Sequence, residues 1–200
     1  MPKTKQQFEQ IREERKDVIL KAALDLFAMK GYDAVNLDEV TKLANCSHGL
    51  LYHYYSGKEE LYKAVLQNIV FPNVMSLYQG INTHQKAKYV LQDLTDAILK
   101  KFKSLDETSI KCAFIVLNIH LKKNLQFIEK DEEGHTKIFN FVRKYIEQGK
   151  TEGDFNDSST SELVICYLSI LKGIAFNRLT LGYKNFVCPD TQIIMRMLLQ

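Results

Sequence analysis

Apolar residues recur at three- and four-residue steps along almost the whole of this 200-residue chain. Such spacing places them on one face of a helix, where they can pack against the apolar faces of other helices. Only three Pro and nine Gly interrupt the pattern, and no segment shows the strict alternation typical of a strand. We therefore expect an all-α fold, long enough for one or two domains with hydrophobic cores of their own.

Capping residues and breaks in the pattern predict where the N-terminal helices begin and end. We expect the first three helices over residues 8–30, 37–44 and 48–54. Asn36 and Ser47 are placed to cap the second and third of these, because their side-chain oxygens can accept from unpaired amides in the first turn. A fourth helix opens near Lys58, capped by either Ser56 or Gly57, and Pro72 should end or kink it.

The rest of the chain continues as a series of helical segments. Ser104 and Ser159 each precede a Glu by three residues, which makes them candidates for capping boxes. The predicted helices cover residues 74–81, 84–103, 106–121, 124–149, 159–182 and 190–199.

Cysteine usage and hydropathy limit where such a protein works. The four cysteines are scattered, and residues 1–14 are polar and charged rather than signal-like, so we expect reduced thiols in the cytoplasm. The richest apolar stretch, residues 163–175, is interrupted by Lys172 and Gly173 and is shorter than the roughly 20 residues that span a bilayer. We expect a soluble protein that needs no membrane, no metal ion and no cofactor.

The segment 36–58 carries the most distinctive residues. Two short helices separated by only three residues, Asn45 to Ser47, have the arrangement of a helix-turn-helix, in which the second helix enters the major groove of DNA. In that second helix Leu51 and Tyr55 should point into the core. The opposite face then carries a glycine and three hydrogen-bonding side chains: His48, Gly49, Tyr52 and His53.

Net charge alone would not suggest DNA binding. The chain carries a formal charge of +3, and residues 1–60 contain nine Lys or Arg against ten Asp or Glu. The hypothesis therefore depends on where particular hydrogen-bond donors lie.

The same segment resembles the tetracycline-repressor (TetR) family. The likeness is carried by residues 19–27 (ILKAALDLF), 30–32 (KGY), 38–40 (DEV) and 47–61 (SHGLLYHYYSGKEEL), and it runs without a gap over about residues 15–66. The remaining two thirds resembles the family mainly in helical layout. The turn departs from the usual Gly-Val by having Asn45 and Cys46, of which Asn tolerates a left-handed backbone best among the residues other than Gly.

The resemblance implies two domains and a set of DNA contacts. Residues 1–57 would form the helix-turn-helix domain, and residues 58–200 a helical bundle for effector binding and dimerisation. Base edges would be met by His48, Gly49 and Leu50, a phosphate by Tyr52, and the groove wall by His53 and Tyr54. Asn36 and Lys58, each at a helix start, would hold flanking phosphates. The expected DNA-binding set is Asn36, Ser47, His48, Gly49, Leu50, Tyr52, His53, Tyr54 and Lys58.

Two further sites are expected in the bundle. Polar residues on otherwise apolar helices are candidates to line an effector pocket: Asn118, His120, Asn177 and Arg178. Apolar positions at bundle spacing on the last two helices are candidates for a homodimer interface: Leu163, Cys166, Ile170, Gly173, Ile174, Ile194, Met197 and Leu198. The expected function is that of a repressor, bound to near-palindromic operator DNA and released by a small molecule.

The alternatives are a helical-bundle enzyme and a protein-interaction scaffold. An enzyme could use Cys112 with His120, or the acidic cluster at residues 131–133 beside His135. Cys112 and His120 would lie two helical turns apart, beyond hydrogen-bonding reach, so we expect buried core residues and no enzymatic activity. Neither alternative explains why the distinctive residues concentrate in segment 36–58.

Overall fold

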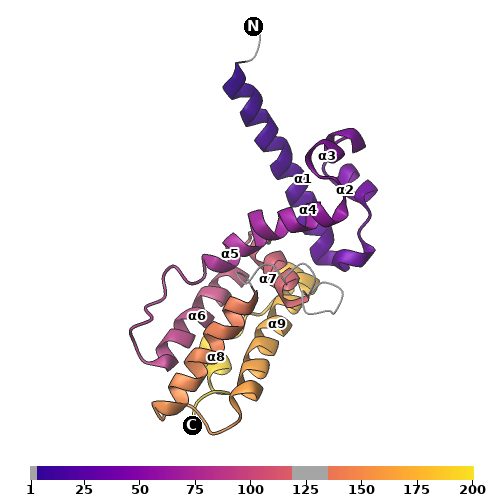
Figure 1. Cartoon of the computed structure of the whole chain (residues 1–200). Coiled ribbons are helices and arrows are strands. Elements are labelled where there is room, and N and C mark those ends of the chain that lie inside the picture. Colours follow the sequence, from indigo (N-terminus) through magenta and orange to yellow (C-terminus); the bar gives the residue numbers. More distant parts are fainter. Residues whose placement is uncertain (1–3, 119–134) are drawn as a thin grey trace. The chain divides into compact units, whose positions relative to one another are not determined.

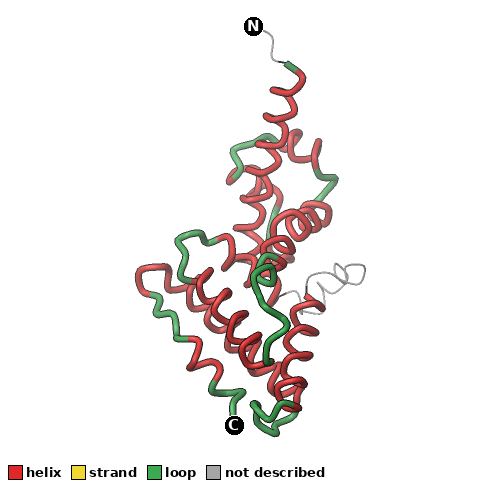
Figure 2. Tube along the Cα trace, turned by 90° about the vertical axis from the view of Figure 1, so that its left-hand side faces the viewer, coloured by secondary structure: helices red, strands yellow, loops and turns green. Residues whose placement is uncertain are grey.

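A computed structural model describes residues 4–118 and 135–200 of the chain. Over these ranges the fold is all-α, as the spacing of apolar residues predicts, and the single β-bridge described pairs Phe155 with Leu199 (Figure 2). The chain divides into two compact units, Met1–Val70 and Phe71–Gln200. The boundary expected after residue 57 precedes a helix that packs against the first helix of the N-terminal unit.

The N-terminal unit consists of α1 (Lys5–Ala34), α2 (Leu37–Leu43), α3 (His48–Tyr54), α4 (Lys58–Val65) and the π-helical segment η1 (Leu66–Val70) (Figure 1). The backbone of α1 leaves the helical conformation at Gly31, with φ 75° and ψ 167°, one residue after the expected end of the first helix at residue 30. The fully buried residues of the N-terminal unit come from every helix in it, among them Ala23, Val40, Leu51 and Leu61.

Pro72 disturbs the helical backbone that precedes it, as expected. A proline has no N–H and its ring conflicts with the carbonyl four residues earlier, here that of Asn68. The α-helical pattern of α4 ends at Val65, the wider π-helical turns of η1 follow, and α5 (Phe71–Met75) begins one residue before Pro72.

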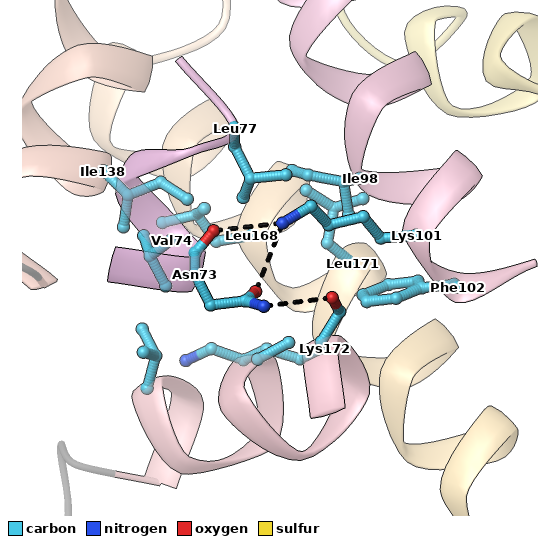
Figure 3. Close-up of a pocket in the computed structure, with 13 residues that line it drawn as sticks. Asn73, Val74, Leu77, Ile98, Lys101, Phe102, Ile138, Leu168, Leu171 and Lys172 are labelled. Carbon is cyan, nitrogen blue, oxygen red and sulfur yellow. Dashed lines mark hydrogen bonds between the residues drawn. The ribbon is translucent and has the colours of Figure 1, made fainter. Parts of the chain in front are cut away.

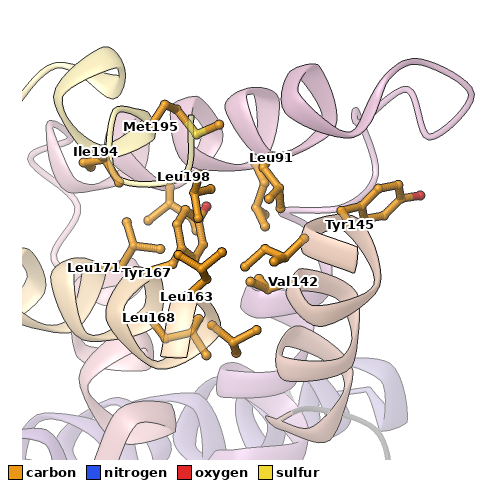
Figure 4. Packing of buried hydrophobic residues seen from close by; sticks show 14 of the residues in the cluster. Leu91, Val142, Tyr145, Leu163, Tyr167, Leu168, Leu171, Ile194, Met195 and Leu198 are labelled. Atoms are coloured by element: carbon orange, nitrogen blue, oxygen red, sulfur yellow. The ribbon is translucent and has the colours of Figure 1, made fainter. Parts of the chain in front are cut away.

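The C-terminal unit contains α5, α6 (Ala87–Phe102), α7 (Thr108–Asn118), α8 (His135–Thr151), α9 (Thr160–Asn185) and α10 (Thr191–Met195). Within it α8 lies between α6 and α9 and packs on both (Figure 1). The core takes Leu91 from α6, Val142 from α8 and Tyr167 from α9, and Leu198 follows α10 (Figure 4). The buried Tyr167 hydroxyl shares a 2.7 Å hydrogen bond with Thr95 Oγ1, so this polar atom is satisfied inside the core.

Several predicted helix boundaries in this unit are wrong. Residues 76–80 form turns in which the amides of Leu77 and Tyr78 donate to carbonyls three residues back, where a helix over 74–81 was expected. Ser104 accepts from the amide of Asp106, and Asp106 accepts from that of Thr108, so α7 starts two residues late and the expected capping box is absent there. Residues 124–134 of the expected helix 124–149 lie outside the described residues. The last helix covers only Thr191–Met195 instead of 190–199.

Helix α9 is long and apolar enough to cross a membrane by length and composition alone. Its buried residues Leu163, Tyr167 and Ala175 pack into the core of the unit, and Arg178 is 1% exposed. The Arg178 side chain donates to the carbonyl oxygens of Phe102 and Ser104, beyond the last α6 hydrogen bonds. These contacts are those of a central helix in a bundle.

The loop after α8 depends on a glycine at its close approach to a ring. The amides of Asp154 and Phe155 both donate to the carbonyl of Gly149, which brings the fully buried Phe155 ring against Gly149. A Cβ added at Gly149 would lie 2.3 Å from Cδ2 of that ring. Only a residue without a side chain fits this contact.

We expect Gly149→Ala to lower the free energy of unfolding by roughly 1–3 kcal/mol, because the Phe155 ring must move out of its packed position. Urea denaturation measures the change. Gly80→Ala is the control, because a Cβ there meets nothing within 4 Å and the residue does not have a positive φ. Equal stability of the two variants would contradict this account of the loop.

Candidate nucleic-acid interface and internal cavity

Two side-chain caps and one left-handed residue shape α2, α3 and the turn between them. Asn36 caps α2 by accepting from the amide of Asp38 at 3.1 Å, and Ser47 caps α3 by accepting from the amide of Leu50 at 3.2 Å. Between them Asn45 adopts φ 47°, the left-handed conformation that Asn tolerates. The predicted caps are confirmed, and Asn45 lies in the turn of four residues, 44–47, that joins the two helices.

Helix α3 has one buried face and one exposed face. Leu51 is fully buried and Tyr55 nearly so, while Tyr52 on the other side is 54% exposed. The remaining residues of the exposed face are His48, Gly49 and His53, and the partly buried positions are Leu50 and Tyr54. The helix therefore presents hydrogen-bonding groups on a glycine-containing surface, where a backbone or a base edge can approach closely.

A depression in the surface lies between α2 and α3. His48 Nε2 is 3.5 Å from Asp38 Oδ1 and 3.4 Å from Thr41 Oγ1, and Lys42 lines the same depression. The Asp38 carboxylate would repel a phosphate, whereas the exposed Lys42 would attract one. Lys42 is not among the expected DNA-binding residues, because the direction of its side chain depends on how α2 packs.

Arg12 of α1 is a second basic residue near α3 that is not among the expected DNA-binding residues. Its guanidinium carbon lies 5.9 Å from the centroid of the Tyr54 ring, at the C-terminal end of α3. A cation at this distance over an aromatic face is attracted by the ring. Arg12 therefore belongs to the surface around α3.

Lys58 has a structural role in addition to any phosphate contact. Gly57, not Ser56, is the N-cap residue of α4, and the Ser56 amide donates instead to Glu60. The Lys58 ammonium donates to the carbonyl oxygens of Asp33 and Val35, both at 3.0 Å, and lies 4.8 Å from the centroid of the Tyr32 ring. These bonds tie the start of α4 to the end of α1, and leave one of three N–H donors for another partner.

The C-terminal unit contains a mostly apolar cavity of about 60 Å³ (Figure 3). Its walls come from α5, α6, α7, α8 and α9, and are formed largely by Val74, Leu77, Ile98, Phe102, Ala113, Val116, Ile138, Leu168 and Leu171. Four polar side chains also line it: Asn73, Lys101, Ser109 and Lys172. Lys101 Nζ donates to the backbone oxygen of Asn73 at 3.1 Å, and Asn73 donates to Ser109 Oγ at 3.2 Å.

The residues expected to line an effector pocket have other positions. Asn177 is exposed, and the buried Arg178 donates to the carbonyl oxygens at the end of α6. Neither residue lines the cavity. His120 and the side chain of Asn118 lie outside the described residues. In the sequence Lys172 interrupts an apolar run and was not among the expected pocket residues. A lysine within such a run is nevertheless the signal that could have located the cavity, because Lys172 lines it.

The residues expected at a dimer interface fall into two groups. Leu163, Ile174, Ile194 and Leu198 lie in the core of the unit and have little surface left for a partner. Cys166, Ile170 and Gly173 are exposed and Met197 is partly buried. The outward side of α9 also carries Ile165, 60% exposed, and Phe176, 50% exposed, neither of which was among the expected interface residues.

The enzymatic alternative receives no support from Cys112. This thiol is buried, and burial raises its pKa to about 12, so it stays protonated and unreactive at neutral pH. Its suggested partner His120, the acidic residues 131–133 and the His135 side chain lie outside the described residues.

Two short capped helices joined by a left-handed turn, with the second helix exposed, define a helix-turn-helix protein. Residues 19–65 match the family model described as bacterial regulatory proteins, tetR family. These residues therefore form an N-terminal domain of the TetR family, in agreement with the motifs at residues 15–66.

Curated relatives carry the names of transcriptional regulators and not of enzymes, as expected. The chain is 31% identical over 119 residues to the biofilm operon icaADBC HTH-type negative transcriptional regulator IcaR of Staphylococcus epidermidis, covering 56% of this chain and 62% of that protein. It is 40% identical over 128 residues to the HTH-type transcriptional activator FasR of Mycolicibacterium smegmatis, covering 64% and 47%. The chain thus spans between about half and two thirds of these relatives.

Solved structures share the fold over nearly the whole chain. The MbdR regulator from Azoarcus sp. CIB superimposes with a TM-score of 0.73 at 19% identity, covering 93% of this chain and 97% of that one. The fatty acid degradation regulator FadR from Bacillus halodurans gives a TM-score of 0.67 at 19% identity, covering 92% and 93%. At this identity the likeness concerns the fold alone.

We expect Lys58→Met to lower the free energy of unfolding by about 1 kcal/mol, because the Asp33 and Val35 carbonyls lose their donor. Thermal and urea denaturation measure the loss. Lys21→Met, at an exposed position of α1, should change stability by less than about 0.5 kcal/mol. A Lys58→Met variant as stable as the control would show that the two hydrogen bonds do not hold α4 to α1.

Proposed function

We propose that the protein is a sequence-specific DNA-binding regulator of transcription that acts in the cytoplasm as a homodimer. The observation that carries the proposal is the exposed face of α3, whose polar side chains and glycine lie on a helix that is capped by Ser47 and anchored by the buried Leu51. Tyr52 contacts a phosphate, and His48, Gly49 and Leu50 meet base edges. Arg12 and Lys42 supply the flanking positive charge that the overall charge balance lacks.

The outward face of α9 supplies the dimer interface in this proposal. Ile165, Ile170 and Phe176 are large apolar side chains that one protomer leaves exposed on the same helix. A second copy related by a two-fold axis would cover them with the same surface. Two copies of α3 then read the two halves of a near-palindromic operator.

Ligand binding in the cavity regulates the affinity for DNA. Asn73 and Val74 line the cavity from α5, which follows η1 directly along the chain. A ligand that moves α5 acts on the π-helical segment, where the hydrogen-bonding pattern already departs from that of an α-helix. To change the free energy of DNA binding by roughly 1–3 kcal/mol, the ligand must bind the DNA-free state more tightly than the DNA-bound state by the same free energy.

Repression is the proposed outcome of operator binding, in line with the name of the staphylococcal relative as a negative regulator. Activation is the second candidate, because the mycobacterial relative is named an activator. A transcription assay with the selected operator placed within a promoter, and then upstream of it, distinguishes the two.

Selection of random duplex DNA at about 0.1 M salt should enrich one near-palindromic sequence. Tyr52→Ala should weaken binding to that sequence by about 1–2 kcal/mol, roughly 5- to 30-fold, because a charge-assisted hydrogen bond to phosphate is lost. Tyr89→Ala, a tyrosine of similar exposure on α6, is the control and should bind as the wild type does. No enrichment, or equal loss in both variants, would contradict DNA binding through α3.

Ile170→Glu should shift the protein from dimer to monomer, because an unpaired carboxylate in an apolar interface costs roughly 2 kcal/mol or more. Sedimentation velocity measures the change, and operator affinity should fall with it because a monomer contacts only one half-site. The control is Leu105→Glu, at a 74% exposed position between α6 and α7. A variant that remains dimeric would place the interface elsewhere.

A further inference from the structure

The cavity of the C-terminal unit combines apolar walls with two ammonium groups. Lys101 reaches it from α6 and Lys172 from α9 (Figure 3). Among the described residues, the lining of the cavity contains no acidic side chain. Two positive charges without a carboxylate in the same wall give the cavity a positive potential, which its apolar surroundings screen less than water would.

Lys172 has no hydrogen bond or ion pair with any described residue. The residue is partly buried, and burial lowers the pKa of its ammonium. Removing an ammonium from water without a partner costs free energy, and the group regains it when an anion binds. Lys172 therefore favours an anionic partner inside the cavity.

Lys101 is hydrogen-bonded, but only to neutral oxygens. Its ammonium donates to the backbone oxygen of Asn73, to Asn73 Oδ1 at 3.4 Å and to Ser76 Oγ at 2.7 Å. Burial lowers the pKa of this ammonium, against the opposing charge of Asp106, which does not line the cavity. An anion would be a stronger acceptor than any of these oxygens.

These contacts join the cavity to the segment that leads towards η1. Asn73 lies within α5 and Ser76 directly follows it, and the Lys101 ammonium donates to both. The 60 Å³ of free space accommodates a few water molecules, so a larger ligand has to displace side chains. An anion that takes over Lys101 would release Asn73 and Ser76 and free α5 to move.

We propose that the cavity binds a small molecule with one anionic head group and an apolar body, with Lys172 and Lys101 pairing with the head group. The inference depends on the proposed function, because it names the class of effector for that regulator. The apolar body packs against Leu77, Ile98 and Leu168, in place of the side chains that it displaces. The positive potential disfavours cations, and the neutral analogue lacks the charge that the two lysines recognise.

The test compares head groups on one apolar body. Octanoate, octan-1-ol and octylammonium are titrated into the full-length protein by calorimetry, and 3-phenylpropanoate is compared with 3-phenylpropan-1-ol to vary the body. At least one carboxylate should bind about tenfold or more tightly than its alcohol, as expected for a charge-assisted hydrogen bond in a partly buried site. Octylammonium should bind no more tightly than octan-1-ol.

Substitutions of Lys172 test whether this lysine causes the preference for a carboxylate over its alcohol. Lys172→Met should reduce it at least about fivefold, and Lys172→Arg should retain most of it. The matched control is Lys184→Met, at an exposed lysine of the same helix. Because Met removes a partly buried charge, we expect the Lys172→Met variant to be folded and to have a Tm no lower than the wild type.

The outcomes separate this inference from the proposed function. The inference is wrong if neither carboxylate binds more tightly than its alcohol, or if Lys172→Met leaves the preference unchanged, even when operator binding is intact. Carboxylate binding that depends on Lys172 supports the inference by itself. If that binding leaves operator affinity unaltered, the ligand class stands and the regulatory role of the cavity fails.

Discussion

Tyr167, Leu171 and Ala175 project from one face of α9 into the core of the C-terminal unit, where almost no water reaches them. This packing commits the inward side of the longest helix of the unit to its own chain. The hydrogen bond between Tyr167 and Thr95 also fixes how α9 is oriented against α6, because a buried hydroxyl without a hydrogen-bond partner would cost free energy. With that side fixed, the apolar residues on the opposite side of α9 remain exposed, and Lys172 is left at the edge of the core beside the cavity.

Local chemistry was the part of this protein that the sequence predicted well. Asn36 and Ser47 cap the helices they were expected to cap, and Asn45 takes the left-handed backbone that its side chain tolerates. Each of these outcomes depends on neighbours within three residues, so a single sequence contains the information. The exposed face of α3 follows for the same reason, because the spacing of Leu51 and Tyr55 fixes which side is buried.

Tertiary contacts decided the features that the sequence did not predict. Lys58 has donors that suit a phosphate, yet two carbonyls from a segment more than twenty residues away occupy two of them. Ser104 has the spacing of a capping residue, but the amide of Thr108 at the start of α7 donates to Asp106, and Ser104 accepts only from the amide of Asp106. Leu163 and Ile170 have equal apolar character on one helix, and only the packing of α6, α8 and α9 shows that the first is in the core and the second is outside.

The exposed apolar side of α9 has a consequence for the life of the protein in the cell. In the proposed dimer the same helix supplies the core of one protomer and the surface that its partner covers, so folding and association share one element. An assembly of this kind is stabilised by mass action, and dilution removes part of its stability. The number of copies in the cell would then set how long each chain escapes unfolding and proteolysis, as well as how often an operator is occupied.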